Sequence, residues 1–260
     1  MTSEELELRP AGEPSQPALA SELQYDVIIP NYVTEQSRQM VLNCLASLRL
    51  YSANYRLILV DNASPDFDAI GEELKQHPHR LIRNESNVGF VKAVNQGMRA
   101  SSAPFVVLLN NDTEVVPGWL ERLRNPLTGN VGLSGPRSNL NGTLSATMPQ
   151  LKPTVLPKPA MLVFFCVMIR RDVIDAIGLL GEQFGVGLGD DDEYCQRAQA
   201  AGYDLIYVGD LVVFHYHKMT FRSLYSEKEL RTMARRAQRL LASRFPNWYT
   251  RLRNFVVRNF

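Results

Sequence analysis

The chain is poor in cysteine and has no apolar run long enough to cross a bilayer. Its 3 cysteines, Cys44, Cys166 and Cys195, are widely spaced and show no metal-ligand spacing. We therefore expect free thiols in a reducing compartment. The longest apolar run, Ala160 to Ile169, is about half of what a membrane span needs. The start of the chain shows no basic segment followed by an apolar one, so a signal peptide is not expected.

A large net charge is also missing. The 260 residues include 28 Lys and Arg against 27 Asp and Glu, which leaves +1. This balance argues against nucleic-acid binding by the whole molecule. The charge is unevenly placed, however. Residues 1–24 are rich in Glu, Pro and Ser, lack periodicity and are predicted to form a disordered tail. Residues 222–260 are strongly basic.

Short apolar segments alternate with helical patterns between residues 25 and 221. Continuous apolar strands separated by helices predict an α/β, Rossmann-like single domain with a mostly parallel central sheet. The region Val131–Pro157 is rich in Gly, Pro and polar residues and is expected to form loops. The expected strands are 25–30, 56–60, 81–83, 105–109, 161–169, 205–208 and 211–215, and the expected helices are 36–50, 90–100, 119–124, 171–177 and 193–201.

Three expected strands end in clusters of polar residues. Ligands of open parallel sheets bind beyond the carboxyl ends of the strands, so three clusters on one edge suggest a nucleotide site. Tyr32 would stack on the base, Asp61 would accept a base N–H and Asp112 would lie near a metal. Each cluster alone is also a common turn sequence. The clusters are Pro30-Asn31-Tyr32, Asp61-Asn62-Ala63-Ser64 and Asn110-Asn111-Asp112-Thr113.

The usual phosphate-binding loops are missing from the sequence. There is no P-loop motif, and the glycines of Gly185–Gly189 run directly into acids that would repel a pyrophosphate. An anionic diphosphate would instead need a divalent cation such as Mn²⁺ or Mg²⁺. Asp112, with an imidazole from His215 or His217, is the candidate ligand set, because carboxylate and imidazole suit Mn²⁺-like ions.

Four consecutive acids, Asp190-Asp191-Asp192-Glu193, open a helical pattern. One or two acids would serve as a helix N-cap and favour the positive end of the helix dipole. Four exceed that need and repel one another, which favours a functional use.

These segments, in this order and spacing, resemble the GT-A glycosyltransferases of family 2, and most of all the bacterial rhamnosyltransferase-type branch that builds surface polysaccharides. The resemblance covers roughly Tyr25 to Phe221. It rests on Val27–Tyr32, Val60–Ser64, Asn87-Val88-Gly89-Phe90 with Asn95-Gln96-Gly97, Leu108–Asp112, and Asp190–Cys195 with Arg197 and Gly202-Tyr203.

The resemblance implies a role for each matching position. Asp191 would be the general base beside Asp190, and His215 would join Asp112 at the metal. This sequence departs from the family pattern at Val33, at Gly181 and at the two asparagines before Asp112. The asparagines replace acids, so they leave fewer charges for the metal and predict weaker metal binding. Nucleotide-sugar contacts are implied for Pro30, Asn31, Tyr32, Asp61, Asn62, Asn87, Gly89, Asn95, Asn110 and Asn111.

The expected function is inverting, metal-assisted transfer of a hexosyl or rhamnosyl group from a UDP- or dTDP-linked sugar to a glycan or lipid-linked acceptor. Two alternatives are a degenerate transferase that only binds nucleotide and a nucleotidyltransferase that makes the sugar nucleotide. The latter usually has a basic, Gly-rich loop after the first strand, which Pro30–Ser37 lacks.

The C-terminal segment 222–260 has helical apolar faces with arginines on the remaining faces. Three readings remain open: helices packed on the core, an interfacial helix on an anionic membrane, and a homodimer contact. The expected location is cytoplasmic, with peripheral contact at the inner face of the membrane.

Overall fold

The computed structural model describes residues 23–139, 152–156, 160–185, 187–216 and 226–246. In these residues nine strands form a sheet in the order β3-β2-β1-β4-β8-β6-β9-β5, with β7 paired to β9. The strands are β1 (Tyr25–Asn31), β2 (Tyr55–Asp61), β3 (His79–Arg83), β4 (Phe105–Leu109), β5 (Thr113–Glu114), β6 (Val131–Ser138), β7 (Pro153–Val155), β8 (Cys166–Arg170) and β9 (Asp204–His215).

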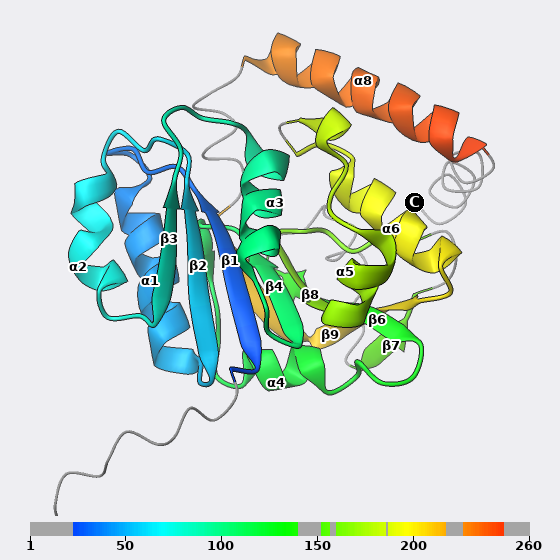
Figure 1. Ribbon diagram of the computed structural model, residues 1–260, viewed down its shortest axis with the longest axis horizontal. Helices are drawn as coiled ribbons and strands as arrows, with labels where there is room; N and C mark the ends of the chain where they lie inside the picture. Colours follow the sequence, from blue (N-terminus) through cyan, green and yellow to red (C-terminus); the bar gives the residue numbers. More distant parts are fainter. Residues whose placement is uncertain (1–22, 140–151, 157–159, 186, 217–225, 247–260) are drawn as a thin grey trace, which may run out of the picture.

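Helices cover both faces of this sheet. α1 and α4 pack on one core cluster, and α3, α5 and α6 pack on the other. The C-terminal helix α8 lies across the top of the molecule, above α3 and α6 (Figure 1). The helices are α1 (Arg38–Tyr51), α2 (Gly71–Leu74), α3 (Phe90–Ala100), α4 (Trp119–Arg124), α5 (Arg171–Ile177), α6 (Asp190–Ala200) and α8 (Glu227–Arg244), with short 3₁₀ turns η1 (Phe67–Ile70) and η2 (Glu182–Phe184).

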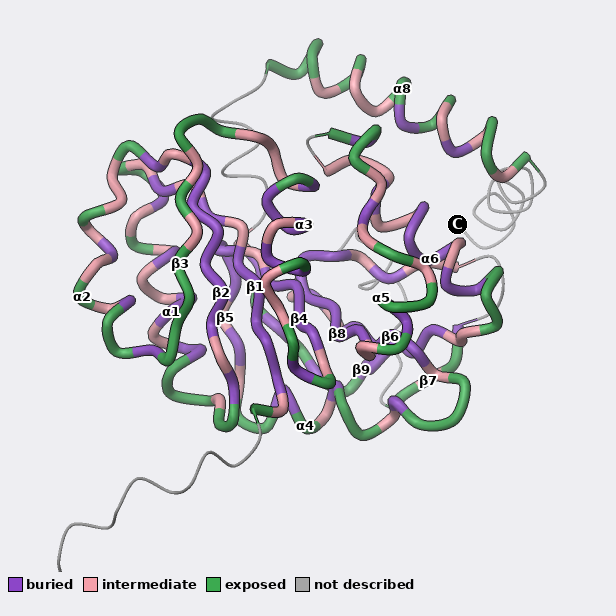
Figure 2. The backbone as a smooth tube through the Cα atoms, viewed as in Figure 1, coloured by how far each residue is buried: buried purple, intermediate pink, exposed green. Residues whose placement is uncertain are grey.

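The strands β1 to β4 are parallel, as the continuous apolar sequences of β1, β2 and β4 predict. β1 pairs with β2 and β4, and β2 pairs with β3, all in parallel. The interior residues of β1, β2 and β4 are buried because helices lie on both faces, whereas the edge strand β3 is mostly exposed (Figure 2). β8 then runs antiparallel to both β4 and β6, so β6 points the same way as β4. The carboxyl ends of β1, β2, β3, β4 and β6 therefore share one edge of the sheet.

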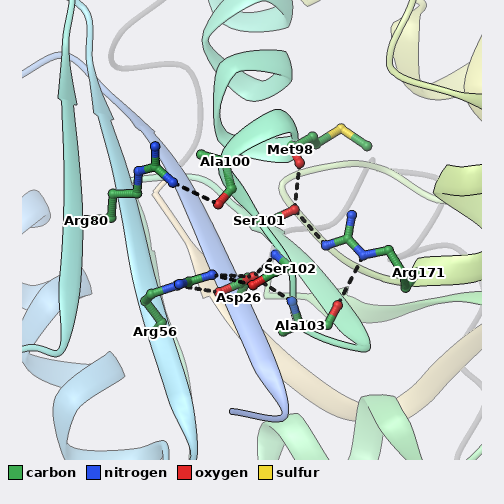
Figure 3. A network of polar contacts seen from close by, with 9 residues as sticks. All are labelled: Asp26, Arg56, Arg80, Met98, Ala100, Ser101, Ser102, Ala103 and Arg171. Carbon is green, nitrogen blue, oxygen red and sulfur yellow. Dashed lines mark hydrogen bonds and ion pairs between the residues drawn. The ribbon is translucent and has the colours of Figure 1, made fainter. Parts of the chain in front are cut away.

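A buried ion pair holds the opposite, amino-terminal edge together. The carboxylate of Asp26 is fully buried, and Arg56 donates to its two oxygens at 2.9 and 3.0 Å. The main-chain N–H groups of Ser102 and Ala103 donate to the same carboxylate at 2.6 and 2.8 Å (Figure 3). This network joins β1 and β2 to the turn before β4. A buried carboxylate with this many donors is well compensated.

Gly97 allows α3 to approach the sheet closely. A Cβ atom at this position would overlap Cγ2 of Ile28 on β1. The close approach fixes α3 directly over β1, so the first turn of α3 is set at the carboxyl edge.

The expectation of loops over Val131–Pro157 is wrong for the described part of this region. β6 and β7 are strands, and β6 accommodates its proline beside a register shift between Pro136 and Arg137. The two short strands expected at 205–208 and 211–215 are one continuous strand, β9. The expected strand at 161–169 begins only at Cys166, and α6 begins at Asp190 rather than Glu193.

The structure also bears on the remaining expectations. Within the described residues, no helix is long and apolar enough to span a membrane. The apolar face of α8 packs on the core through Ala237 and Leu241, as one of the three readings expected. Residues 1–22 of the tail predicted at 1–24, His217, and residues 217–225 and 247–260 lie outside the described residues.

Candidate functional site

The carboxylate of Asp61 is the centre of a polar network at the ends of β1, β2 and β3. Asp61 lies opposite Asn31 and Arg83 in the sheet register and is fully buried. One of its oxygens accepts from Nδ2 of Asn31 at 3.1 Å and from the Ser64 hydroxyl. The other accepts from the main-chain N–H of Ser64 and from Nε of Arg83, both at 3.3 Å. Each oxygen therefore already has two protein donors.

Arg83 extends this network toward solvent. Its guanidinium carbon lies 4.1 Å from the centre of the Phe67 ring, and its side chain is half exposed. Since Nε is bound to Asp61 and the plane rests on Phe67, the orientation of the guanidinium is fixed. Pro30 and Tyr32 lie half-buried at and just beyond the end of β1, beside this network.

Asn62 belongs to a second polar group toward α3. Its Oδ1 accepts from Nδ2 of Asn84 at 2.9 Å. Asn84 and Gln96 exchange amide hydrogen bonds of 2.8 and 3.0 Å in both directions. The loop after β2 is thereby tied to the loop after β3 and to α3.

Asp112 and His215 meet where β5 pairs with the end of β9. Oδ1 of Asp112 lies 3.1 Å from Nε2 of His215, and both residues are largely buried. The ring of His215 stacks on Phe165, with centroids 4.9 Å apart, and its main-chain N–H donates to Asn139 at 2.7 Å. Nδ2 of Asn110 lies 3.5 Å from the same Nε2. The predicted metal pair is thus brought together, although the two residues are 103 positions apart.

These two side chains could bind a divalent cation, and oxygens of a bound diphosphate would complete its coordination. One carboxylate oxygen and one imidazole nitrogen at this separation can both turn toward one ion, and both donor types suit Mn²⁺. No group of three or more His, Cys, Asp and Glu that could hold a metal occurs in the described part of the chain. A ligand would therefore have to supply further oxygens.

Asn111 points away from this pair. Its Nδ2 donates to Oδ1 of Asn31 at 3.0 Å, so it links the end of β4 to the network around Asp61. An aspartate at this position could not donate that bond, which gives the asparagine a structural reason.

The segment that begins α3 divides into an exposed and a buried part. Asn87 is exposed, and its side chain accepts from the N–H of Gly89, which has a φ of 85°. Asn95 lies in the second turn and is buried. It donates to the carbonyl of Leu180 at 2.9 Å and to Glu182 at 3.2 Å, and accepts from the N–H of Leu180 at 3.0 Å. Asn95 therefore clamps α3 to the 180–182 segment, whereas Asn87 and Gly89 lie at the carboxyl edge.

The four acids form the first turn of α6. Asp190 and Glu193 are buried, whereas Asp191 and Asp192 are half-buried. Burial raises the pKa of Asp190, and the charge of Asp191 raises it further. Burial also raises the pKa of Asp191, against the opposing effect of main-chain N–H groups at the start of the helix. An aspartate that binds a proton more readily than usual is suited to accept one from a substrate.

The sequence reasoning missed several residues of the site. Arg83 could have been found, because a parallel register places the end of one strand beside the end of the next. Ser64 stood within a quoted cluster but was given no role. Asn84, Gln96 and the partner of Glu193 on α8 lie in contacts that no local spacing indicates.

The fold matches solved glycosyltransferases of the GT-A type. The S. aureus TarS 1-349 structure in complex with UDP-GlcNAc aligns over 85% of this chain and 66% of that one, with a TM-score of 0.65 and 15% identity. The mannosyltransferase PcManGT from Pyrobaculum calidifontis, in complex with GDP-Man and Mn²⁺, aligns over 85% and 63%, with a TM-score of 0.64 and 18% identity. The chain therefore has a GT-A fold.

The sequence gives the family. The model of glycosyl transferase family 2 matches residues 26–178, more than half of the chain, so the chain belongs to that family. The glycosyltransferase AglE of Haloferax volcanii is 26% identical over 207 residues, which are 73% of this chain and 66% of that protein. The chain thus matches less than two thirds of that relative's length. The acids of α6 lie beyond the span of the family match.

Proposed function

We propose that this chain transfers a sugar from a nucleoside-diphosphate sugar to a hydroxyl of an acceptor, with inversion at the anomeric carbon. The observation that carries the proposal is the arrangement of the carboxyl edge. It brings the network around Asp61, the pair of Asp112 and His215, and the start of α3 to one edge of a GT-A sheet. The resemblance to family 2 supplies the role of Asp191 as general base.

The nucleoside would lie between the loops that follow β1 and β2. Tyr32 would stack on the base, and Pro30, Asn31, Asp61 and Asn62 would shape its site. Asn87 and Gly89 would face the diphosphate, beside Asn110 and Asn111. Asn95 would act indirectly, since its side chain is bound to the 180–182 segment. The proposed nucleoside is uridine or thymidine; the solved neighbours carry UDP-GlcNAc or GDP-Man.

Asp191 would remove the proton from the acceptor hydroxyl as its oxygen attacks the anomeric carbon. The bond from that carbon to the diphosphate oxygen breaks, and the nucleoside diphosphate leaves with the electron pair. A single base and direct displacement give inversion. A divalent cation held by Asp112 and His215 would neutralise charge on the leaving diphosphate. A positioned base contributes about 10²–10⁴-fold.

The donor sugar, the acceptor and the biological role are also part of this proposal. We infer a hexosyl or rhamnosyl donor, a glycan or lipid-linked acceptor, and a role in cell-surface polysaccharide synthesis. The basic face of α8 supports the proposal that the enzyme acts at the cytoplasmic face of a membrane, near a lipid-linked acceptor. A second reading is a nucleotide-binding protein without turnover. The asparagines that replace acids before Asp112 favour it.

Turnover of nucleotide sugars tests the proposal. Purified protein is incubated with a panel of UDP-, dTDP- and GDP-sugars, with Mn²⁺ or with chelator, and release of nucleoside diphosphate is measured. Slow release from at least one donor, accelerated by Mn²⁺, is expected. Tight binding of a nucleoside diphosphate with no release from any donor, with or without sugar acceptors, would support the binding protein instead.

A further inference from the structure

The C-terminal helix α8 packs on the backbone that leads into the acids of α6. Ala237 and Leu241 on α8 are buried in the same core cluster as Phe184 and Tyr194. A Cβ atom on Gly189 would lie 3.2 Å from Cβ of Ala237 and 3.2 Å from Cδ1 of Leu241. Gly189 also has a φ of 86°, which an L side chain rarely adopts. α8 therefore touches the residue directly before Asp190.

An ion pair joins the same two helices. Glu193 is 1% exposed, and its Oε1 lies 2.9 Å from Nε of Arg197 and 3.1 Å from Nη1 of Arg244. Arg197 comes from the next turn of α6 and also donates to the carbonyls of Ile177 and Leu179. Arg244 comes from the last turn of α8. A buried carboxylate is costly unless cations and donors compensate it, so Glu193 depends on both arginines.

The charges around Asp191 are strongly one-sided. On its own helix Asp191 interacts with the carboxylates of Asp190 and Asp192 and with the Cys195 thiol one turn on, while Glu193 acts on Asp190 and pairs with Arg197. Main-chain N–H groups of its own turn and of Phe164 also face it. Among the described residues, α8 contributes one cation to this cluster, Arg244, through Glu193. All the arginines of α8, Arg244 included, are exposed, but Arg244 reaches Glu193 whereas Arg235 and Arg239 lie on the face turned away from the buried residues of α8.

We propose that Arg244 is a positioning residue for the proposed catalytic base. It anchors α8 on the first turn of α6 and supplies the positive charge that lets Asp191 ionise beside three other acids. The role of Asp191 as a catalytic base rests on the proposed function, whereas the coupling between Arg244 and the acids of α6 does not. α8 lies beyond the span of the family match and becomes, on this account, part of the acceptor side of the site.

Charge coupling and simple structural support predict different results. Arg244→Gln removes a cation and should raise the titration midpoint of Asp191 by about half a pH unit, as expected for a charge nearby at high effective dielectric. Glu193→Gln removes an anion and should lower that midpoint. If the ion pair were purely structural, both substitutions would shift the titration midpoint of Asp191 in the same direction, because both would loosen α8 from α6.

The midpoints are measured by NMR on protein labelled with ¹³C at the aspartate carboxyls, with Asp191→Asn assigning the resonance. Arg244→Lys should keep the wild-type midpoint, and Arg239→Gln, on the outer face of α8, is the matched control. Thermal melting checks that each variant is folded. If Arg244→Gln does not fold, Glu193→Gln alone decides by the direction of its shift. Shifts of both variants in one direction, or unmoved midpoints, would overturn the proposal.

A second measurement ties the coupling to turnover. The acid limb of the pH profile for release of UDP from a UDP-sugar should move with the NMR midpoint in each variant, while the affinity for UDP stays at the wild-type value. If wild-type protein turns over no donor, the proposed function fails, yet the NMR result still decides the coupling. If turnover is present but its pH profile ignores both substitutions, the positioning role is wrong and the proposed function stands.

Discussion

Asp61 shows how one buried carboxylate organises the loops that follow β1, β2 and β3. Four protein donors from Asn31, Ser64 and Arg83 already surround it. A nucleobase N–H would have to share an oxygen with one of them. Arg83 has nitrogens, Nη1 and Nη2, for which no partner occurs among the described residues, and guanidinium groups donate only. The network is therefore suited to a base that offers both an N–H and a carbonyl oxygen.

We predict that Arg83 contributes to base selection. Uracil offers a carbonyl where cytosine carries an amine, so the wild type should bind UDP more tightly than CDP by about tenfold, the worth of one hydrogen bond. Arg83→Met keeps contact with Phe67 but should abolish the preference, and Asp61→Ala should weaken both nucleotides. Calorimetric titration measures the affinities, with Arg80→Met on the same strand as the control. Equal affinity of the wild type for UDP and CDP would contradict these roles.

Asp112 and His215 are predicted to share one divalent cation when nucleoside diphosphate is bound. Asp112→Ala or His215→Ala should each lower the affinity for Mn²⁺, measured in the presence of UDP, by about tenfold or more, since each removes one of two protein ligands. His79→Ala, an exposed histidine on β3, is the control. Unchanged Mn²⁺ affinity in both site variants, or full turnover in excess chelator, would rule the pair out as the metal site.

At the scale of elements, the buried charge in the first turn of α6 lowers the stability of the fold. The pKa of Asp190 is raised by burial and by Asp191, so the folded state binds its proton more tightly than the unfolded chain does. The folded state therefore holds more protons than the unfolded state at pH values between the unfolded and folded pKa of Asp190. Stability contributed by this group is present below the unfolded pKa and is lost as pH rises toward the folded one.

Asp190→Asn mimics the protonated carboxyl and should therefore stabilise the fold at high pH. We expect the melting temperature to rise by a few degrees near pH 8, with a gain that disappears near pH 4. Circular dichroism melts across this range measure the effect. Asp175→Asn, at an exposed acid of α5, is the control and should show no such trend. A gain that grows as pH falls would mean that Asp190 is stabilised as a charged group.

Much of the sheet could be predicted from sequence because β1, β2 and β4 are buried on both faces and read as continuous apolar runs. β6 could not, since Gly132 and Gly135 make room for Tyr203 and Leu162, and Pro136 sits beside a bulge. Glycine and proline at such places look like loop residues. β9 was divided in the prediction because Gly209-Asp210 interrupts its apolar pattern, whereas its pairing with β6 continues past that point.

The candidate site was predictable where its residues follow strands. Asn31, Asp61 and Asp112 come from strand ends, so a parallel sheet brings them to one edge. Side-chain direction was not predictable: Asn95 turns to Leu180, and Asn111 turns to Asn31. The ion pair between Glu193 and Arg244 depends on how α8 packs, which no local pattern specifies.

For the whole molecule, α8 presents its apolar side to the core and its basic side outward. Lys228, Arg235 and Arg239 are exposed on the outer face. Each basic residue near an anionic surface is worth about 1 kcal/mol, so three together can favour vesicle binding by roughly a hundredfold. The basic face and the contact with α6 together would place an anionic membrane near the proposed base.

Binding to anionic vesicles should therefore weaken with salt and with replacement of these three residues by Gln. Co-sedimentation at low and high salt measures it. The control replaces three exposed cations elsewhere on the molecule, Arg49, Lys75 and Arg80, and should sediment like the wild type. Equal sedimentation of the α8 variant and the wild type would leave the basic face as a solvated surface.

The most direct test of the account is Asp191→Asn, studied with a donor that the wild type turns over. The carboxylate at this position is proposed to act on the acceptor and not on the nucleotide. Release of nucleoside diphosphate should fall by about 10²-fold or more, whereas the affinity for UDP measured by calorimetry should stay within a few fold. Near-normal turnover in Asp191→Asn would contradict the account and remove Asp191 from the mechanism.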